Sequence, residues 1–313
     1  MNNPLAVSLR PIVAALPADF RLVVADIGSV GGLHKRWESI ADRLVTINFD
    51  PLDPRDSTES ARSFPYLVGD EEKVATLKMT RRATMSSTLP PSRNFFAPFW
   101  DKPSHVEVVK EIQAPMVRLD QLMAREKLSP DAIKIDVQGG EAAVIAGATD
   151  TFRGSILLAE IECSFAVRYE GQESFDQIVA RMRDLGFGLL DVRRLKRYRY
   201  QNAEGVRDPS LGQGMRAGRL AFCDAIFALE PELLWQRIER GGEANGPYAA
   251  LKAMLLFLTY GKADLAATML DRGAEDMPAA TRDACLRFFA RLKGDGGWKQ
   301  RLHQKVDRLA RIV

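Results

Sequence analysis

Asp136 is the residue of this chain whose surroundings best fit a chemical role. It lies in residues 133–147, where a short apolar strand pattern is followed by two glycines and by a helix that opens at Glu141. An acid near the carboxyl end of a buried parallel strand lies where open α/β sheets bind ligands. Burial beside a cofactor would raise its pKa and suit it to general base catalysis. The alternative is a hydrogen-bonded acid at a strand end with no chemical role.

Glu160 and Glu162 lie two residues apart in another apolar strand pattern, so their side chains share one face of that strand. Carboxylates rarely lie in a buried strand without a partner, which indicates a chemical role or a basic neighbour. Glu160 is therefore the second candidate for a catalytic residue. Asp136 could equally hold a hard divalent cation with Glu160 or Glu162, and the residues alone do not decide between a base and a metal ligand.

A second glycine-rich segment follows a strand pattern near the N-terminus. Asp26 precedes Gly28, Ser29 and Gly32, and the glycines would let the backbone approach a ligand closely. The spacing is not the GxGxxG of dinucleotide enzymes; an acid two residues before the first glycine is typical of S-adenosylmethionine sites. These four residues are candidate cofactor ligands. The alternative is a tight turn between a strand and a helix.

Two further acids end strand patterns in the same half of the chain. Asp50 lies about 22 residues after Gly28, the offset expected of an acid that accepts hydrogen bonds from ribose hydroxyls. Asp70 could by its position accept from an adenine amino group. As alternatives, Asp50 is a turn acid before Pro51, and Asp70 caps a turn or a helix.

The elements that must position these residues alternate between strands and helices. Strand patterns cover residues 21–26, 44–50 and 65–69, and residues 33–42 read as a helix. This rhythm predicts a parallel sheet with right-handed crossovers. It breaks at residues 70–117, where strands at 75–80 and 105–112 flank a long polar loop that we interpret as a lid.

The later part of the chain completes the sheet and then becomes helical. Further strands are predicted at residues 131–137, 156–163, 187–192 and 223–229, and helices at 117–127 and 174–185. After Pro231 only helical patterns occur, at residues 232–239, 247–260, 262–271, 279–292 and 298–311. We therefore predict an N-terminal extension (1–20), an α/β domain (21–229) and a helical C-terminal domain (230–313). The last could mediate homo-oligomerisation or the docking of a protein partner.

Composition excludes several classes of protein. The 313 residues are 46% hydrophobic and 27% charged, as in an ordinary soluble globular protein. A net charge of +3 does not indicate a dedicated nucleic-acid or membrane-surface protein. Three widely spaced cysteines fit reduced thiols rather than a zinc site. Without a signal peptide or a transmembrane pattern we expect a cytoplasmic protein, for which peripheral attachment to a membrane stays open.

Alternating Arg and Tyr side chains form the strongest local run of charge, RRLKRYRY at residues 193–200. Such a run could bind sugar, phosphate or RNA. A solvated pair of strands near the sheet edge is at least as good an interpretation. No recognised nucleic-acid-binding motif accompanies the run, so no nucleic-acid partner is expected.

Four segments together resemble the FkbM family of S-adenosylmethionine-dependent methyltransferases. They are VVADIGSVGGLHKRW (23–37), TINFDPL (46–52), ATMSSTLPPS (83–92) and IKIDVQGGEAAVIAGA (133–148), and AEIECSFAVRY (159–169) with LGFGLLDV (185–192) also fits. The last of the four is similar to the most specific motif of the family, with matches at Lys134, Asp136, Gly139, Glu141 and Gly147. Val30 and Asp50 depart from the residues most common there, Asn and Glu, which indicates a divergent branch.

The resemblance implies a fold and an activity. The fold is α/β: a doubly wound, seven-stranded, mostly parallel sheet of the Rossmann-like class I methyltransferases, here with an all-helical C-terminal appendage. The activity is methyl transfer from S-adenosylmethionine to a hydroxyl of a sugar, a glycan or a related small metabolite. A positioned base would take the hydroxyl proton. The resemblance also makes Ser87, with Ser86 in the paired-serine loop, a candidate contact to cofactor or substrate.

Two other functions stay open at this point. A binding or scaffold protein could have kept the fold and lost the chemistry, and it would bind no cofactor. An RNA methyltransferase could use the Arg and Tyr run, and its binding to RNA would weaken steeply with salt.

Overall fold

A computed structural model describes residues 8–28, 32–52, 56–207, 216–239 and 245–294. The chain divides into two compact units. One, the sheet unit, comprises residues 22–33 and 45–247; the other, the helical unit, comprises residues 1–21, 34–44 and 248–313.

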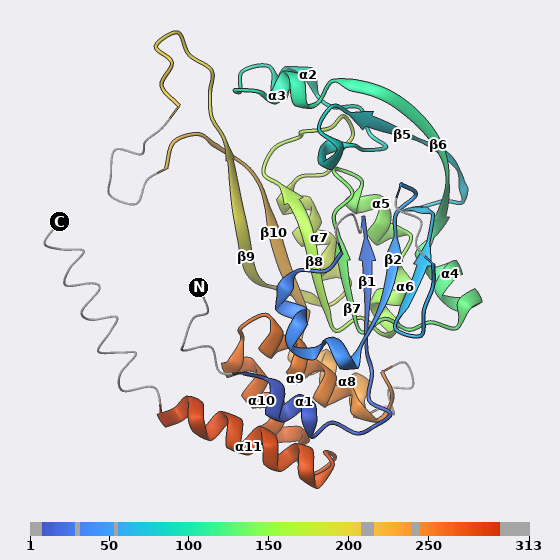
Figure 1. Cartoon of the computed structure of the whole chain (residues 1–313), viewed down its shortest axis with the longest axis vertical. Helices are drawn as coiled ribbons and strands as arrows, with labels where there is room; N and C mark the ends of the chain where they lie inside the picture. Colours follow the sequence, from blue (N-terminus) through green and yellow to red (C-terminus); the bar gives the residue numbers. More distant parts are fainter. Residues whose placement is uncertain (1–7, 29–31, 53–55, 208–215, 240–244, 295–313) are drawn as a thin grey trace, which may run out of the picture. The chain divides into compact units, whose positions relative to one another are not determined.

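Seven strands form the main sheet of the sheet unit, in the order β3-β2-β1-β7-β8-β10-β9 (Figure 1). The strands are β1 (Leu22–Ile27), β2 (Leu44–Phe49), β3 (Ala61–Phe64), β7 (Ala132–Ile135), β8 (Leu158–Ser164), β9 (Phe187–Tyr198) and β10 (Arg219–Leu229). β7 pairs in parallel with β1 and with β8, whereas β10 runs antiparallel to both its neighbours. The predicted α/β fold with a seven-stranded, mostly parallel sheet is confirmed, and its doubly wound character stays a prediction.

A second, three-stranded sheet contributes the other wall of the site described below. It consists of β4 (Leu67–Gly69), β5 (Lys73–Thr80) and β6 (Val108–Arg118) in the order β4-β6-β5. β4 pairs in parallel with β6, and β5 pairs antiparallel with it. The prediction of residues 65–69 as the third strand of the main sheet is therefore wrong. That place is taken by β3, and Pro65, which has no N–H to donate, ends it.

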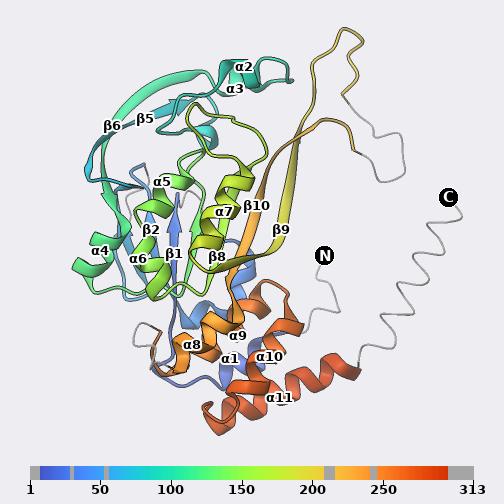
Figure 2. The same cartoon turned by 180° about the vertical axis from the view of Figure 1, so that it is seen from behind.

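Helices of the sheet unit connect the strands, and α5, α6 and α7 lie on one face of the main sheet (Figure 2). The helices are α2 (Arg93–Phe96), α3 (Lys102–His105), α4 (Leu119–Glu126), α5 (Glu141–Ala146), α6 (Thr149–Gly154), α7 (Phe175–Asp184), α8 (Pro231–Glu239) and the 3-10 helix η2 (Ala83–Met85). As predicted, Ser174 caps the start of α7, where it forms a capping box with Gln177, and the helix ends before Gly186, whose φ is 87°.

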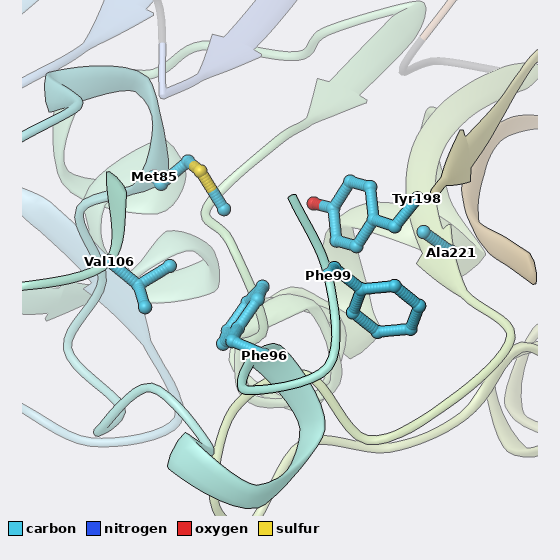
Figure 3. Packing of buried hydrophobic residues seen from close by; sticks show 6 residues of the cluster. All are labelled: Met85, Phe96, Phe99, Val106, Tyr198 and Ala221. Carbon is cyan, nitrogen blue, oxygen red and sulfur yellow. The ribbon is translucent and has the colours of Figure 1, made fainter. Parts of the chain in front are cut away.

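The predicted polar lid contains short helices and a small apolar core. Between β5 and β6 the chain forms η2, α2 and α3, which pack against β9 and β10 (Figure 3). The cluster consists of Met85, Phe96, Phe99, Val106, Tyr198 and Ala221. Burial of these side chains stabilises the segment over the site, so most of it is not an open loop.

The helical unit contains α1 (Arg10–Ala14), the 3-10 helix η1 (Lys35–Arg43), α9 (Ala249–Thr259), α10 (Ala263–Gly273) and α11 (Ala279–Gly294); the 3-10 turn η3 (Gly246–Tyr248) precedes α9. α9 is buried on all sides from Ala249 to Phe257, which makes it the core helix of this unit. Trp37 of η1 meets the Tyr260 ring edge-on, with 5.9 Å between ring centroids. The helix predicted at residues 33–42 is thus a 3-10 helix shifted by a residue or two.

The compact units differ from the predicted division at residues 20 and 230. Residues 1–21 and 34–44 group with the C-terminal helices, and α8 groups with the sheet unit. Because compactness does not test independent folding, the three predicted domains and the docking role of residues 230–313 stay predictions. The helix predicted at 298–311 lies outside the described residues, and no described helix is long and apolar enough to cross a bilayer.

Candidate functional site

A cavity of about 740 Å³ lies between the carboxyl ends of β1, β2 and β7 and the three-stranded sheet. Its walls include Gly28, Asp50, Asp70 and Asp136, four of the residues singled out in the sequence. Its volume is that of a typical site for a cofactor or small molecule, and its place at the strand ends is where parallel sheets bind ligands.

Other predicted site residues do not reach this cavity in the described part of the chain. Asp26, Gly32, Ser87 and Glu160 are not among its lining residues, although Ser86 is. Ser87 is buried, and its Oγ accepts a hydrogen bond from the Leu89 N–H within the turn. Ser29 lies outside the described residues.

Gly28 lies where three strands of the main sheet meet. Its φ is 82°, and its N–H donates to the carbonyl of Phe49 in β2 over 3.0 Å. A Cβ on this residue would collide with the carbonyl oxygen of Asp136. Glycine is therefore required both by the backbone conformation and by the approach of β7, and its bare backbone forms part of the cavity wall.

Asp26, Lys134 and Glu160 form a row across β1, β7 and β8. They are direct neighbours in the register, so their side chains share one face of the sheet. Lys134 Nζ lies 3.1 Å from Asp26 Oδ1 and 4.0 Å from Asp136 Oδ2. Asp26 Oδ2 is buried without a hydrogen-bond partner among the described residues.

These neighbours set the charges at the base of the cavity. Burial raises the pKa of Asp26, and Lys134 opposes that shift. Burial lowers the pKa of Lys134, but the carboxylates of Asp26, Asp136 and Glu160 together raise it above its ordinary value. Lys134 therefore stays protonated and presents a fixed positive charge at the cavity wall.

Gln138 holds the Asp136 carboxylate from the other side. Its Nε2 donates to Asp136 Oδ1 over 2.8 Å and to Glu162 Oε1 over 2.9 Å, while its Oε1 accepts from the Tyr169 hydroxyl at 3.3 Å. The φ of Gln138 is 56°, a left-handed conformation that costs a non-glycine residue about 1–2 kcal/mol. Strain of this kind collects at functional sites, and here it aims an amide at two carboxylates.

Glu162 lies behind Asp136, in a buried ion pair. Arg168, 1% exposed, approaches Glu162 Oε1 within 2.5 Å and donates through Nε to the Ser164 hydroxyl over 2.7 Å. Burial and the neighbouring carboxylate of Asp136 raise the pKa of Glu162, and the guanidinium of Arg168 opposes that rise. Neither Gln138 nor Arg168 was singled out in the sequence, and the only local signal for Gln138 is its place between Asp136 and the glycines.

A cation site formed by Asp136 with Glu160 or Glu162 finds no support in this geometry. The donor amide of Gln138 lies between Asp136 and Glu162, and Glu160 faces Lys134. Among the described residues no group of three or more His, Cys, Asp or Glu side chains could hold a metal ion.

Asp50 and Asp70 face the part of the cavity near β2 and β4. Asp50 is buried, and its Oδ1 accepts from the Leu52 N–H over 2.7 Å, which fixes the carboxylate. Asp70 is exposed and adjoins Gly69, the last residue of β4. The two acids are thus brought together on the same cavity, as their positions at strand ends led us to expect.

Comparison with protein families gave a match over residues 36–189, to the family described as methyltransferase FkbM domain. This range includes Asp50, Asp70, Asp136 and Gln138 but not Gly28. Comparisons with curated proteins and with solved structures gave no match.

Proposed function

Since residues 36–189 belong to the FkbM methyltransferase family, we propose that this protein transfers a methyl group from S-adenosylmethionine to a hydroxyl oxygen of a sugar, a glycan or a related small molecule. The observation that carries the proposal is the convergence of Gly28, Asp50 and Asp136 on one cavity of about 740 Å³. Such a volume accommodates a cofactor and the reacting end of an acceptor together.

The cavity near β1 and β2 has the features that this cofactor needs. The missing Cβ of Gly28 leaves bare backbone for close approach. The fixed carboxylate of Asp50 is an acceptor for a pair of ribose hydroxyls, and the carboxylate of Asp70 is an acceptor for the amino group of adenine. Asp26 does not line the cavity, but its buried Oδ2 has no hydrogen-bond partner among the described residues and leaves one further acceptor in β1. When bound, S-adenosylmethionine supplies a methyl group on a positively charged sulfur.

Polar side chains of the segment after β5 suit a hydroxyl-rich acceptor. Thr84, Ser86 and Thr88 line the cavity together with Lys78, whose Nζ donates to the carbonyl of Thr88 over 3.1 Å. Hydroxyls both donate and accept hydrogen bonds, which is the complement that a polyol presents. This wall supports a sugar or sugar derivative as the acceptor.

Asp136 is the proposed general base. It would accept the proton as the acceptor oxygen forms its bond to the methyl carbon. Gln138 and Lys134 hold the carboxylate in one orientation. Glu160, which faces Lys134 and does not line the cavity, is the weaker candidate.

Calorimetry on the whole protein tests the cofactor. We expect micromolar binding of S-adenosylmethionine, about −8 kcal/mol. Asp50→Asn should weaken binding at least about tenfold, because it removes a charged acceptor of two hydrogen bonds. Asp184→Asn, at an exposed position of α7, is the matched control. A folded wild type that binds no S-adenosylmethionine would refute the proposal and favour a scaffold that lost the chemistry.

Transfer of labelled methyl groups to a panel of sugars, nucleotide sugars and oligosaccharides then tests the acceptor. Asp136→Asn should lower turnover by about 10²–10⁴-fold, the usual contribution of a general base, with unchanged affinity for the cofactor. Turnover that survives this substitution would show that the base lies elsewhere.

A further inference from the structure

Positive charge is concentrated in one short part of the chain. Residues 193–220 contain eight Arg and Lys and two acids, a net charge of +6. The whole chain carries only +3, so everything outside this segment is net negative, at −3. The described residues of the segment, 193–207 and 216–220, end β9, continue past it and return into β10; we refer to them as the basic arm (Figure 1).

A bulge in β9 exposes consecutive cations. A regular strand with one buried face would hide every second side chain, yet all five residues from Arg193 to Arg197 are exposed. The φ of Arg194 is 49°, and the register between β9 and β10 shifts beside it, between Phe222 and Asp224. Arg194 pairs with Asp224 over 3.0 Å, whereas within the described chain Arg193 and Lys196 have no carboxylate within ion-pair distance.

Apolar side chains are exposed among these cations. Leu195 is 53% exposed, Tyr200 49% and Val206 62%. A surface that serves only solubility gains nothing from exposing aliphatic side chains between arginines. Cations mixed with exposed aliphatic and aromatic side chains are the pattern of a membrane-interface surface.

The root of the arm is anchored on the apolar cluster of Figure 3. Tyr198 is buried there, and Lys102 Nζ lies 4.7 Å from the centroid of its ring. Beyond it, Tyr200 forms a β-bridge with Phe99. The cations are therefore presented on a fixed base, and binding would cost little ordering of this part of the chain.

Protection of the sheet edge explains only part of this arrangement. β9 is an edge strand, and charged residues on edge strands prevent pairing with other chains. That role accounts for Arg193–Arg197. It does not account for Arg199 and Arg207, which lie past the end of β9, or for the exposed Val206.

Single-stranded RNA would need aromatic faces on which bases can stack. Tyr198 is buried, and Tyr200 and Trp100 each already contact a protein group through the ring. Tyr198 is 6% exposed, Tyr200 packs on Phe99 at 4.9 Å between centroids, and the guanidinium of Arg207 lies 4.2 Å from the centroid of the Trp100 ring. The geometry favours a flat anionic surface over nucleic acid.

We propose that the basic arm binds an anionic phospholipid membrane. Its arginines and lysine lie against the headgroups, while Leu195 and Val206 enter the interface. The proposal does not depend on methyl transfer.

Flotation with lipid vesicles tests it on the whole protein. We expect binding to vesicles with about 30% phosphatidylglycerol and none to pure phosphatidylcholine, with a marked loss at about 0.5 M NaCl. The triple variant Arg193→Glu, Lys196→Glu, Arg197→Glu should bind at least about a hundredfold more weakly, because each cation near an anionic surface contributes about fivefold.

A second triple variant of equal charge change controls for net charge. Lys110→Glu, Arg153→Glu and Arg183→Glu reverse exposed cations elsewhere in the sheet unit and should leave vesicle binding nearly unchanged. Val206→Ser should reduce the binding that survives high salt. Circular dichroism and S-adenosylmethionine calorimetry on the same samples report folding and the proposed function separately.

Three outcomes would overturn the proposal. Equal losses in the two triple variants would mean that net charge alone drives binding. Tighter binding to a single-stranded RNA probe than to anionic vesicles, sensitive to the arm variant, would identify a nucleic-acid surface. Absence of binding to both probes would leave edge protection as the explanation of the arm.

Discussion

Two glycines of the N-terminal motif offer a matched pair of substitutions. Gly28 and Gly32 both have left-handed backbones, with φ of 82° and 74°. A Cβ at Gly28 would meet the carbonyl of Asp136, whereas a Cβ at Gly32 would meet no atom of the described residues within 4 Å. Gly28→Ala and Gly32→Ala therefore share the cost of a left-handed backbone, and only Gly28→Ala adds a steric collision.

The shared cost is small. An alanine in the left-handed region costs about 1–2 kcal/mol. A less flexible unfolded chain returns about 0.4–1 kcal/mol of this, so Gly32→Ala should lose at most about 1.6 kcal/mol.

The cost specific to Gly28 comes from strand ends that must separate. The Asp136 N–H donates to the carbonyl of Ile27, and the Gly28 N–H donates to that of Phe49, each over 3.0 Å. Each buried donor left unpaired costs about 1–3 kcal/mol. With the backbone cost added, Gly28→Ala should lose about 3–5 kcal/mol.

Thermal and urea unfolding measure this difference. A gap of about 3 kcal/mol corresponds to roughly 6–10 °C in Tm for a domain of this size. Calorimetry should also show loss of S-adenosylmethionine binding in Gly28→Ala and its retention in Gly32→Ala, because only Gly28 lines the cavity. Equal destabilisation of the two variants, or a Gly28→Ala variant as stable as the wild type, would show that a Cβ at Gly28 does not force the strand ends apart.

Three further predictions concern buried groups. Arg168→Met should lower the free energy of unfolding by about 3–5 kcal/mol, because it leaves Glu162 buried without its cation. Urea unfolding of the double variant with Glu162→Met should show that most of this loss is recovered. If nothing is recovered, the ion pair is not the source of the loss. Burial raises the pKa of Asp224 to about 6, and Arg194 opposes this rise. The contribution of Asp224 to stability is therefore complete below about pH 4 and is lost as pH rises through about 6. Relative to Asp224→Asn, the free energy of unfolding of the wild type should fall by up to about 3 kcal/mol between these pH values, and a difference that does not change with pH would contradict the raised pKa. All three cysteines are buried, and burial raises the pKa of Cys223 and Cys285 to about 12 and about 11, so a thiol reagent at about pH 8 should react only after unfolding.

The strands of the main sheet were predictable where local chemistry marks their ends. β1, β2 and β7 are apolar runs closed by Gly28, Asp50 and Asp136, and these three strands and β8 each lie within two residues of their predicted bounds. β3 was missed because it contains Arg62 and Ser63, and its pairing with β2 depends on a register that no local pattern encodes. The assignment of β4 to a second sheet likewise depends on its pairing with β6, which lies far along the chain.

The candidate site, like the strands, was predictable only where local sequence marks it. Asp50 and Asp136 were found because strand ends are where α/β sheets bind ligands. The part played by Gln138 depends on contacts with Glu162 and Tyr169, which come from elsewhere in the chain. Arg168 lies in a polar segment that reads as exposed, yet it is buried because Glu162 and Ser164 supply its partners.

The three-stranded sheet begins and ends at neighbouring points of the fold, so it can diverge without a change in the main sheet. Its first strand pairs with its last, with Leu67 beside Met116 and Gly69 beside Arg118, so the chain enters and leaves the insertion at adjacent points. No strand of the main sheet comes from within it. The segment can therefore change in length and sequence while the seven-stranded register stays intact. The cavity wall that we propose for the acceptor can then diverge separately from the strand ends that carry Gly28, Asp50 and Asp136.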